Sequence, residues 1–375
     1  MRMPRILSFY LVREVLQYAA LGFFALGSIF VAQNMFRRLD TFLGTGFEWA
    51  DFFVVLGSVL ALVSGYLLPV GFLFGVLVAV GRLSADSEIV AMRASGMGMR
   101  ELVAPIALAA LPIAIFSGVM LTEIEPEARR ELRALWRTML SRGAFLAPGR
   151  FIAVGDRVVF VEQLAEENTL RGVVISDHSN PERPFMVVAS GGRFYLEEDS
   201  GQVHLELVEG DIHFEPKNLS ETAYRRIGFE RFDYPIEAQS LLAENVGKLK
   251  PRDLRMEELR DVIARGRAGE SLEAYRDHNV NVYVGQLHRR YALAFAPIVF
   301  ALLGTPLAIR RARGGRSSGA FLCVSLIFVY YMLLSFGEYL TESDTLPPQI
   351  ALWAPNVAFA GFAAALYWRG QRGPV

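Results

Sequence analysis

Long apolar runs lie at both ends of the chain, and polar residues are concentrated in its middle. A membrane-spanning helix needs roughly 20 predominantly apolar residues. Six segments meet this requirement, at about residues 15–36, 52–80, 102–122, 291–309, 319–339 and 349–368. The pattern therefore predicts three spans in residues 1–124, a polar insertion in residues 125–290, and three further spans in residues 291–375.

The polar insertion divides into three parts. Residues 125–141 are charged and helical in pattern, so they extend the third span, and residues 251–290 are again helical in pattern. Between them, residues of about 149–237 contain short runs of Val, Ile, Leu and Phe separated by turn residues, which is typical of strands. We expect strands at 157–163, 172–177, 185–189, 203–209 and 211–215. Strands at this spacing predict an all-β sandwich or jelly roll.

The positions of the basic residues predict the orientation in the membrane. Cytoplasmic loops of membrane proteins carry an excess of Lys and Arg. One side of the predicted spans carries Arg2, Arg5, Arg13, Arg82, Arg93, Arg100, Arg310, Arg311, Arg313, Arg316, Arg369 and Arg372. The short loop on the other side contains Glu342 and Asp344 and no basic residue. We therefore expect both termini in the cytoplasm and the central domain outside it.

The sequence offers little catalytic chemistry. Lys248 follows a glycine but lacks the upstream glycine and the following Ser or Thr of a phosphate-binding loop. Neither a Gly-x-Ser-x-Gly nor a His-Glu-x-x-His motif is present. His204 and His213 are expected on neighbouring strands, but two histidines without a further ligand make a weak metal site. The single cysteine, Cys323, lies in an apolar span. We predict no catalytic and no metal-binding residues.

A short charged segment separates the second and third spans, where a plain loop would suffice. Ser84 is a suitable N-cap, Asp86 and Glu88 would lie in the first turn, and Gly96 would follow the last turn. The pattern predicts a helix at about 84–96 that presents a surface to a cytoplasmic partner. The alternative is an ordinary amphipathic helix at the membrane interface.

Charged residues near the outer ends of two spans have two interpretations. Arg37 and Arg38 follow the first span, where they could anchor it by snorkelling or bind the phosphate of an anionic lipid. Glu338 lies near the outer end of the fifth span. An acid at this depth is costly unless it is solvated, protonated or paired. One hypothesis pairs it with Arg37 or Arg38.

Three motifs carry a family resemblance. They are Gly81-Arg82-Leu83-Ser84-Ala85-Asp86-Ser87-Glu88 with Met92-Arg93-Ala94-Ser95-Gly96, Leu303-Gly304-Thr305-Pro306-Leu307 with residues 310–319, and Leu346-Pro347-Pro348 with Trp353-Ala354-Pro355-Asn356. With these motifs the chain resembles the LptF/LptG (YjgP/YjgQ) family of lipopolysaccharide-export permeases over essentially its whole length. The resemblance implies an α-helical protein of the bacterial inner membrane, with six transmembrane helices and an inserted periplasmic β-jellyroll domain.

The resemblance also implies partners. Two related permeases of this family pair above two copies of the ATPase LptB, which binds ATP and Mg²⁺, so this chain would need no cofactor and would not be an enzyme. The β domain would pass lipopolysaccharide to a periplasmic β-jellyroll protein such as LptC or LptA. Nucleic acid is not an expected partner.

Site residues follow from the same resemblance. It identifies the 84–96 segment as the coupling helix that sits in a groove of the ATPase, with Arg82, Ser84, Asp86, Glu88, Met92 and Arg93 as coupling residues. Glu88 matches an acidic residue that contacts a basic residue of the ATPase. Arg37 and Arg38 fall where family members meet the glycolipid phosphates. The first and fifth spans border a lateral gate, which makes Glu338 a possible gate residue.

The leading interpretation is a permease subunit of an ABC transporter that extracts lipopolysaccharide from the inner membrane. One alternative is an ABC permease half for another envelope lipid. A second is a membrane-anchored scaffold whose β domain docks partners, although a scaffold does not require a shaped cytoplasmic helix. A lipid-modifying enzyme fits worst, because no catalytic constellation is present.

Overall fold

The computed structural model describes residues 5–37, 49–141, 148–154, 156–165, 168–180, 183–196, 203–214, 224–236, 249–272, 275, 279–311 and 317–372. The chain forms two compact units. Unit 1 contains residues 1–34, 57–129 and 249–375, and unit 2 contains residues 35–56 and 130–248.

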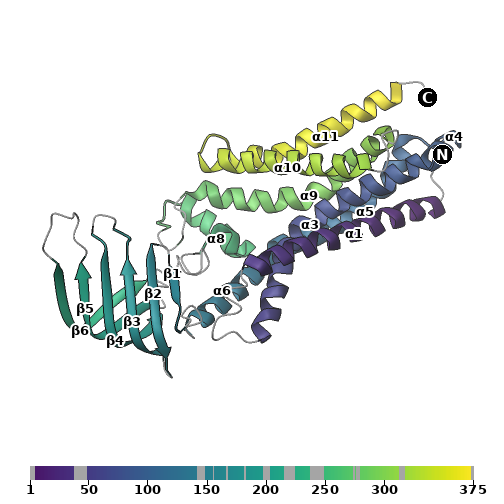
Figure 1. Ribbon diagram of the computed structural model, residues 1–375. Helices are drawn as coiled ribbons and strands as arrows, with labels where there is room; N and C mark the ends of the chain where they lie inside the picture. The colour runs from purple at the N-terminus through teal and green to yellow at the C-terminus, as the bar shows by residue number, and fades with distance from the viewer. Residues whose placement is uncertain are drawn as a thin grey trace. The chain divides into compact units, whose positions relative to one another are not determined.

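Within the described part of the chain, six helices are long and apolar enough to cross a membrane, which confirms the predicted spans. They are α1 (Arg5–Arg37), α3 (Trp49–Ala85), the helix that begins with α5 (Met99–Val119), α9 (Val280–Arg311), α10 (Ser317–Glu342) and α11 (Pro348–Arg372) (Figure 1). Helix α9 is central, since α5, α10 and α11 all pack against it. The main apolar core of unit 1 lies among these helices.

The observed helices are longer than the predicted spans, and the added ends of α3 and α9 are buried by packing. Helix α3 continues to Ala85, and its Leu83 is fully buried in the core. Helix α9 begins at Val280 because Tyr283 and Val284 pack against the connecting helix α8 (Met256–Arg267), which follows a short 3-10 turn at Pro251–Asp253. Hydropathy predicts only the apolar segment that crosses the membrane, so it does not predict helical ends that are stabilised by contacts with other helices.

The predicted extension of the third span is confirmed. Helix α5 passes through a π-helical turn, Met120–Ile124, into α6 (Glu125–Ser141). A π turn shifts the phase of the helix by one residue. Glu125 begins α6 directly after it, and its side chain is buried.

The inserted domain is all-β, as predicted. Its described strands form one antiparallel sheet in chain order: β1 (Phe151–Val154), β2 (Arg157–Leu164), β3 (Thr169–Asp177), β4 (Phe185–Leu196), β5 (Val203–Phe214) and β6 (Arg225–Ile236). The two strands expected at 203–209 and 211–215 are a single strand, β5, because Gly210 pairs within the ladder instead of forming a turn.

A bend crosses this sheet. The pairing of Cα atoms is interrupted at one row, which contains Glu162, Gly172, Ser190, Glu209 and Glu230, one residue from each of β2 to β6. Gly172 and Glu209 both have positive φ, at 60° and 50°. The alternation of buried residues changes phase at this row. In β3 the even-numbered Leu170 is buried before the row, and the odd-numbered Val173 is buried after it. The buried face therefore continues through the bend.

The bend folds the sheet over its own apolar face. In a flat sheet Asp177 of β3 and Tyr234 of β6 would lie roughly 30 Å apart, because Asp177 is in register with Arg225, at the other end of β6. In the structure the Tyr234 hydroxyl donates a hydrogen bond to the Asp177 carboxylate. Arg157 also binds that carboxylate, at 3.2 Å from its Nε. These three side chains form a polar clasp between the two halves of the sheet, which thus makes the two layers of a sandwich.

We expect Tyr234→Phe to loosen the clasp. The change removes a buried hydrogen bond to a charged group, which contributes about 1.5–3 kcal/mol. Amide hydrogen exchange of β3 and β6 in the full chain should accelerate by about tenfold or more. Tyr195→Phe is the matched control, because Tyr195 on β4 is 46% exposed, whereas Tyr234 is buried. Equal exchange in both variants would contradict the clasp.

The clasp should also respond to acid. Burial alone would raise the pKa of Asp177, but hydrogen bonds from Ser179 and Tyr234 and the charge of Arg157 hold that pKa below its ordinary value. Such a carboxyl group stabilises the fold above its unfolded-state pKa of about 3.9, and the stabilisation is lost as the pH falls through the folded-state pKa. Protection of β3, corrected for intrinsic exchange, should therefore decline below about pH 4. In Asp177→Asn this decline in β3 protection below about pH 4 should be absent.

Candidate functional site

The charged segment between the second and third spans contains a short helix, α4 (Glu88–Ala94). The predicted N-cap at Ser84 is wrong, because α3 continues through this residue to Ala85. Asp86 and Ser87 form the turn between the two helices, and Ser87 is the N-cap residue, with a left-handed backbone. Glu88 lies in the first turn, as predicted, whereas Asp86 precedes the helix.

The end of α4 agrees with the prediction at Gly96. The Gly96 amide donates to the Arg93 carbonyl at 3.0 Å, and the Met97 amide donates to the Met92 carbonyl at 3.3 Å. With a φ of 92° at Gly96, these two bonds form a Schellman motif. The motif fixes the direction in which the chain leaves α4 and enters α5.

The inner side of α4 is attached to the membrane helices. Ile89 and Met92 are buried in the core of unit 1. The Tyr10 hydroxyl of α1 donates a hydrogen bond of 3.0 Å to Glu88 Oε2. Because Ile89 and Met92 are buried and Glu88 is hydrogen-bonded, α4 is attached to the ends of the spanning helices and moves with them.

The outer side of α4 is exposed. Val90 is 61% exposed, and Ala91, Arg93 and Ala94 are also exposed. The outer surface of α4 therefore consists of small or apolar side chains beside one arginine.

The other predicted coupling residues stabilise the junction between α3 and α4. Arg82 forms an ion pair of 2.7 Å with Glu14 of α1 and a longer one of 3.9 Å with Asp86. The Ser84 hydroxyl donates to the Ile309 carbonyl of α9 at 3.4 Å. Of the predicted coupling residues, Met92 is buried, Arg82, Ser84 and Glu88 are half-buried, and Asp86 and Arg93 are exposed. Tyr10 and Glu14 were not predicted, because both precede the first predicted span at residues 15–36.

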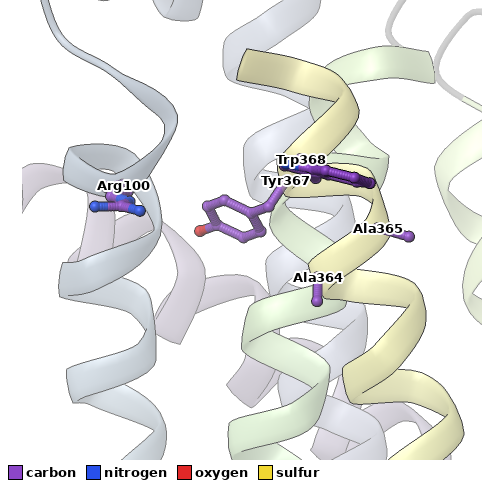
Figure 2. A pocket seen from close by; sticks show the side chains of 5 residues that line it. All are labelled: Arg100, Ala364, Ala365, Tyr367 and Trp368. Atoms are coloured by element: carbon purple, nitrogen blue, oxygen red, sulfur yellow. The ribbon is translucent and has the colours of Figure 1, made fainter. Parts of the chain in front are cut away.

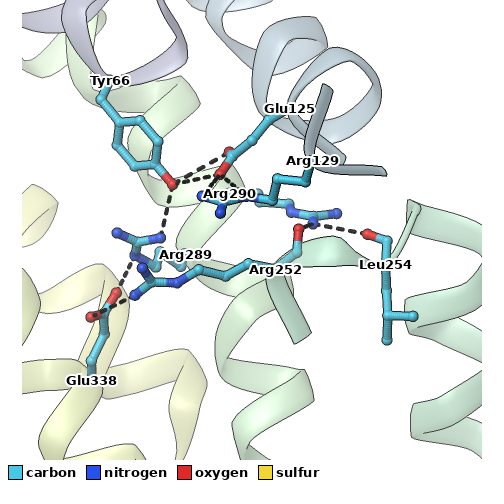
Figure 3. A network of polar contacts seen from close by, with 8 residues as sticks. All are labelled: Tyr66, Glu125, Arg129, Arg252, Leu254, Arg289, Arg290 and Glu338. Atoms are coloured by element: carbon cyan, nitrogen blue, oxygen red, sulfur yellow. Dashed lines mark hydrogen bonds and ion pairs between the residues drawn. The ribbon is translucent and has the colours of Figure 1, made fainter. Parts of the chain in front are cut away.

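Glu338 lies in a second polar site, which Figure 3 shows. It forms an ion pair with Arg289 of α9, and a longer contact of 3.8 Å with Arg252. The hypothesis that it pairs with Arg37 or Arg38 falls on side chains outside the described residues. The partners observed for Glu338 come from α9 and from the connector, which consists of the 3-10 turn Pro251–Asp253 and helix α8.

The same polar site extends to α3 and α6. Arg289 Nη1 donates to the Tyr66 hydroxyl at 3.0 Å, and its guanidinium lies 5.2 Å from the Tyr66 ring centre. The Tyr66 hydroxyl in turn donates to the Glu125 carboxylate, at 3.2 Å from Oε1. Arg129 Nη2 donates to the same oxygen at 2.7 Å. Four helices are thus joined through Arg289 (Figure 3).

Arg290 has a separate structural role beside this site. Its side chain is 1% exposed, and its Nη2 donates to the carbonyl oxygens of Arg252 and Leu254 at 3.1 and 2.9 Å. These bonds attach the connector to α9. Glu125, Arg289 and Arg290 are not predicted from the sequence, because they lie at the predicted edges of spans, where charges are ordinarily solvated.

The two candidate histidines do not form a site. His204 and His213 lie on the same strand, β5, instead of on neighbouring strands. Nine residues of strand place them about 30 Å apart along the chain at roughly 3.3 Å per residue. His204 Nδ1 lies 2.8 Å from Asp233 Oδ2, and His213 contacts Tyr224. Among the described residues no group of three or more possible metal ligands is found.

Two of the sequence motifs that carried the resemblance are placed in the core. Thr305 is buried on α9, where its hydroxyl donates to the Ala301 carbonyl at 2.8 Å. Asn356 of α11 donates to the Ala292 carbonyl at 2.9 Å and accepts from the Tyr330 hydroxyl at 3.1 Å. These contacts link α9, α10 and α11 and give both motifs a role in packing.

The chain is similar to proteins of lipopolysaccharide export. Residues 9–369 match the family described as "Lipopolysaccharide export system permease LptF/LptG". The lipopolysaccharide export system permease protein LptF of Escherichia coli K12 is 25% identical over 367 residues, covering 95% of this chain and 93% of that protein. LptF of Shigella flexneri gives the same values. An uncharacterized Rickettsia prowazekii protein, RP871, is 22% identical over 186 residues, 49% of this chain and 51% of that protein.

The match extends over both sets of spans and the inserted β domain, and the helices and the sheet agree with it. The chain belongs to the LptF/LptG family of lipopolysaccharide export permeases.

Proposed function

We propose that this permease extracts lipopolysaccharide from the inner membrane as one half of a transporter whose ATPase docks on the outer side of α4. The observation that carries the proposal is the two-sided environment of α4. One side is buried in the membrane core and bonded to Tyr10, and the other exposes Val90 and Arg93. A helix restrained in this way transmits the motion of a bound partner to the spans instead of moving independently.

Energy for extraction would come from the partner. Each CH₂ group of an acyl chain holds a lipid in the bilayer by roughly 0.8 kcal/mol. A lipid with several acyl chains therefore does not leave without a driving force. The sequence lacks a phosphate-binding loop, so we infer that ATP and Mg²⁺ bind to an LptB-like ATPase dimer. A second LptF/LptG-type permease would complete the cavity, and the similarity to LptF proteins favours an F-type role for this chain.

We propose that α4 and both termini face the cytoplasm. Figure 1 shows them at the same end of unit 1. Arg82, Arg93 and Arg100 lie in or beside α4, whereas Glu342 ends α10 and Asp344 lies in the loop between α10 and α11. The positive-inside rule supports this orientation. The β domain would then be periplasmic.

The outer end of the spans would receive the lipid phosphates. Arg37 ends α1, and Arg38 follows it in the sequence. Guanidinium groups form strong paired hydrogen bonds with phosphates. We propose that these two arginines bind the headgroup and that Glu338, bound to Arg289, stabilises the neighbouring end of α10. The lipid would then move along the bent sheet to a periplasmic β-jellyroll protein such as LptC or LptA.

The proposal predicts that the outer side of α4 is required for ATPase binding. Val90→Asp should reduce recovery of the ATPase with the purified permease pair by about tenfold, because it places a charge in the proposed contact. Lipopolysaccharide-stimulated ATP hydrolysis should fall with it. Arg13→Glu, an exposed change on α1, is the control. Failure of the wild-type chain to bind any ATPase would instead favour a scaffold.

The role of Glu88 can be separated from its bond to Tyr10. Tyr10→Phe removes the 3.0 Å hydrogen bond between the two residues, at a cost of about 1 kcal/mol, and Glu88→Gln weakens it by replacing a charged acceptor with a neutral one. If Glu88 also contacts a basic group of the ATPase, Glu88→Gln should lower ATPase recovery more than Tyr10→Phe. Equal effects of the two changes would limit Glu88 to anchoring α4.

The ion pair of Glu338 should contribute to the stability of unit 1. We expect Glu338→Gln and Arg289→Gln each to lower the thermal midpoint of the detergent-solubilised chain. In a double-mutant cycle their effects should be non-additive by about 0.5–3 kcal/mol. Glu342→Gln, an exposed change on the same helix, is the control for Glu338→Gln. Additive effects would contradict a direct interaction.

A further inference from the structure

A hollow lies between the start of α5 and the last turns of α11. It has a volume of about 600 Å³ and is lined by Arg100, Ala364, Ala365, Tyr367 and Trp368. Figure 2 shows the Tyr367 ring projecting from α11 toward Arg100 on α5. Its lining residues are distinct from the exposed residues of α4 and from the polar site around Glu338.

The lining residues face away from the protein core. Ala363 and Leu366, the neighbours of the lining residues on α11, are buried in that core. Trp368 is 61% exposed, and Ala364, Ala365 and Arg100 are exposed as well. The hollow therefore opens toward the surroundings of the helix bundle, which for a spanning helix are lipid.

Apolar stripes continue from the hollow along both helices. On α5, exposed residues follow Arg100 at helical spacing, at Ala104, Leu108, Leu111 and Ile115. On α11, a second stripe leads to the hollow through Val357 and Gly361. Both helices pack against α9. The stripes thus provide two apolar surfaces that run from a basic end toward the middle of the spans.

This arrangement matches the parts of a phospholipid. An arginine guanidinium pairs with a phosphate through two hydrogen bonds. Tyr and Trp favour the level of the headgroups, where the hydroxyl or indole N–H can reach polar groups. The alanines leave room for the glycerol region, and the stripes offer apolar contact to acyl chains. Basic hollows between spanning helices on the cytoplasmic side are suited to anionic headgroups.

We propose that the hollow binds one anionic phospholipid, whose phosphate contacts Arg100 and Tyr367 and whose acyl chains follow α5 and α11. This lipid is a resident of the permease and is not the exported substrate. The proposal goes beyond transport, since it needs neither the ATPase nor lipopolysaccharide. It requires only that α5 and α11 cross the membrane.

Native mass spectrometry of the full chain in detergent tests the proposal. The purified chain is titrated with phosphatidylglycerol and, separately, with phosphatidylcholine of the same acyl chains. The first phosphatidylglycerol should bind more tightly than the first phosphatidylcholine. Arg100→Gln should weaken phosphatidylglycerol binding about fivefold, the factor expected for one interfacial basic residue, and should leave phosphatidylcholine binding unchanged.

Two further variants make the result specific. Arg13→Gln removes an exposed arginine from α1 and should leave both affinities unchanged. Ala364→Trp fills the hollow and should weaken phosphatidylglycerol binding while Arg100 remains. Size-exclusion profiles show whether each variant is folded.

Four results would overturn the proposal. Equal wild-type affinity for the two lipids would indicate ordinary boundary lipid, and an equal loss in Arg13→Gln would indicate a diffuse charge effect. Inorganic phosphate that binds with the same dependence on Arg100 would assign the site to a free anion. Displacement of phosphatidylglycerol by lipopolysaccharide at equal concentration would assign it to the substrate. None of these results bears on ATPase docking at α4, which is tested separately.

Discussion

The packing of unit 1 depends on the polar partners that surround the buried cation of Arg289. The Arg289 side chain is 12% exposed on a helix that crosses the membrane. An unpaired charge in such a place is costly, so opposite charge and hydrogen-bond acceptors must come from other helices. Glu338 of α10 provides the opposite charge, and the Tyr66 hydroxyl of α3 accepts a hydrogen bond from Arg289. Glu125, at the start of α6, accepts a hydrogen bond from Tyr66. The π turn directly before Glu125 changes the helix phase at this point, which sets the direction of its carboxylate.

A similar principle operates at the other end of unit 1, with a different consequence. Glu14 and Arg82 pair between α1 and α3, and Tyr10 binds Glu88, so these three charged side chains of the junction have partners within the permease itself. What remains at the surface of α4 is mostly small and apolar, with Val90 as its largest exposed apolar side chain and Arg93 as its exposed basic one. A partner would thus gain binding energy from apolar contact without having to break the internal ion pairs. The same contact would leave the mechanical connection to α1 and α3 intact.

Hydrophobic periodicity was sufficient to predict the six spans, the helical extension and the all-β insertion, because each depends on long runs of the chain. It failed at the start of α4, since Ser84 has the chemistry of an N-cap but sits beside Leu83, whose burial keeps α3 helical. It does not identify Arg289 as a partner of Glu338, because the two residues are distant in sequence and only the packing of α9 against α10 brings them together. A charge at the edge of a span does not reveal from sequence whether it faces water or another helix.

The two layers of the bent sheet are continuous through the bend, unlike the layers of a sandwich made of two separate sheets. Its two layers share every ladder from β2 to β6, and only side chains join them across the interior, as in the contact of Tyr234 with Asp177. The edge strands of the described sheet are β1 and β6. Separating the layers would therefore cost apolar contacts and the clasp but no backbone hydrogen bond away from the bend. An acyl chain that entered between the layers would replace those apolar contacts, so the interior could admit a lipid while the ladders remain paired.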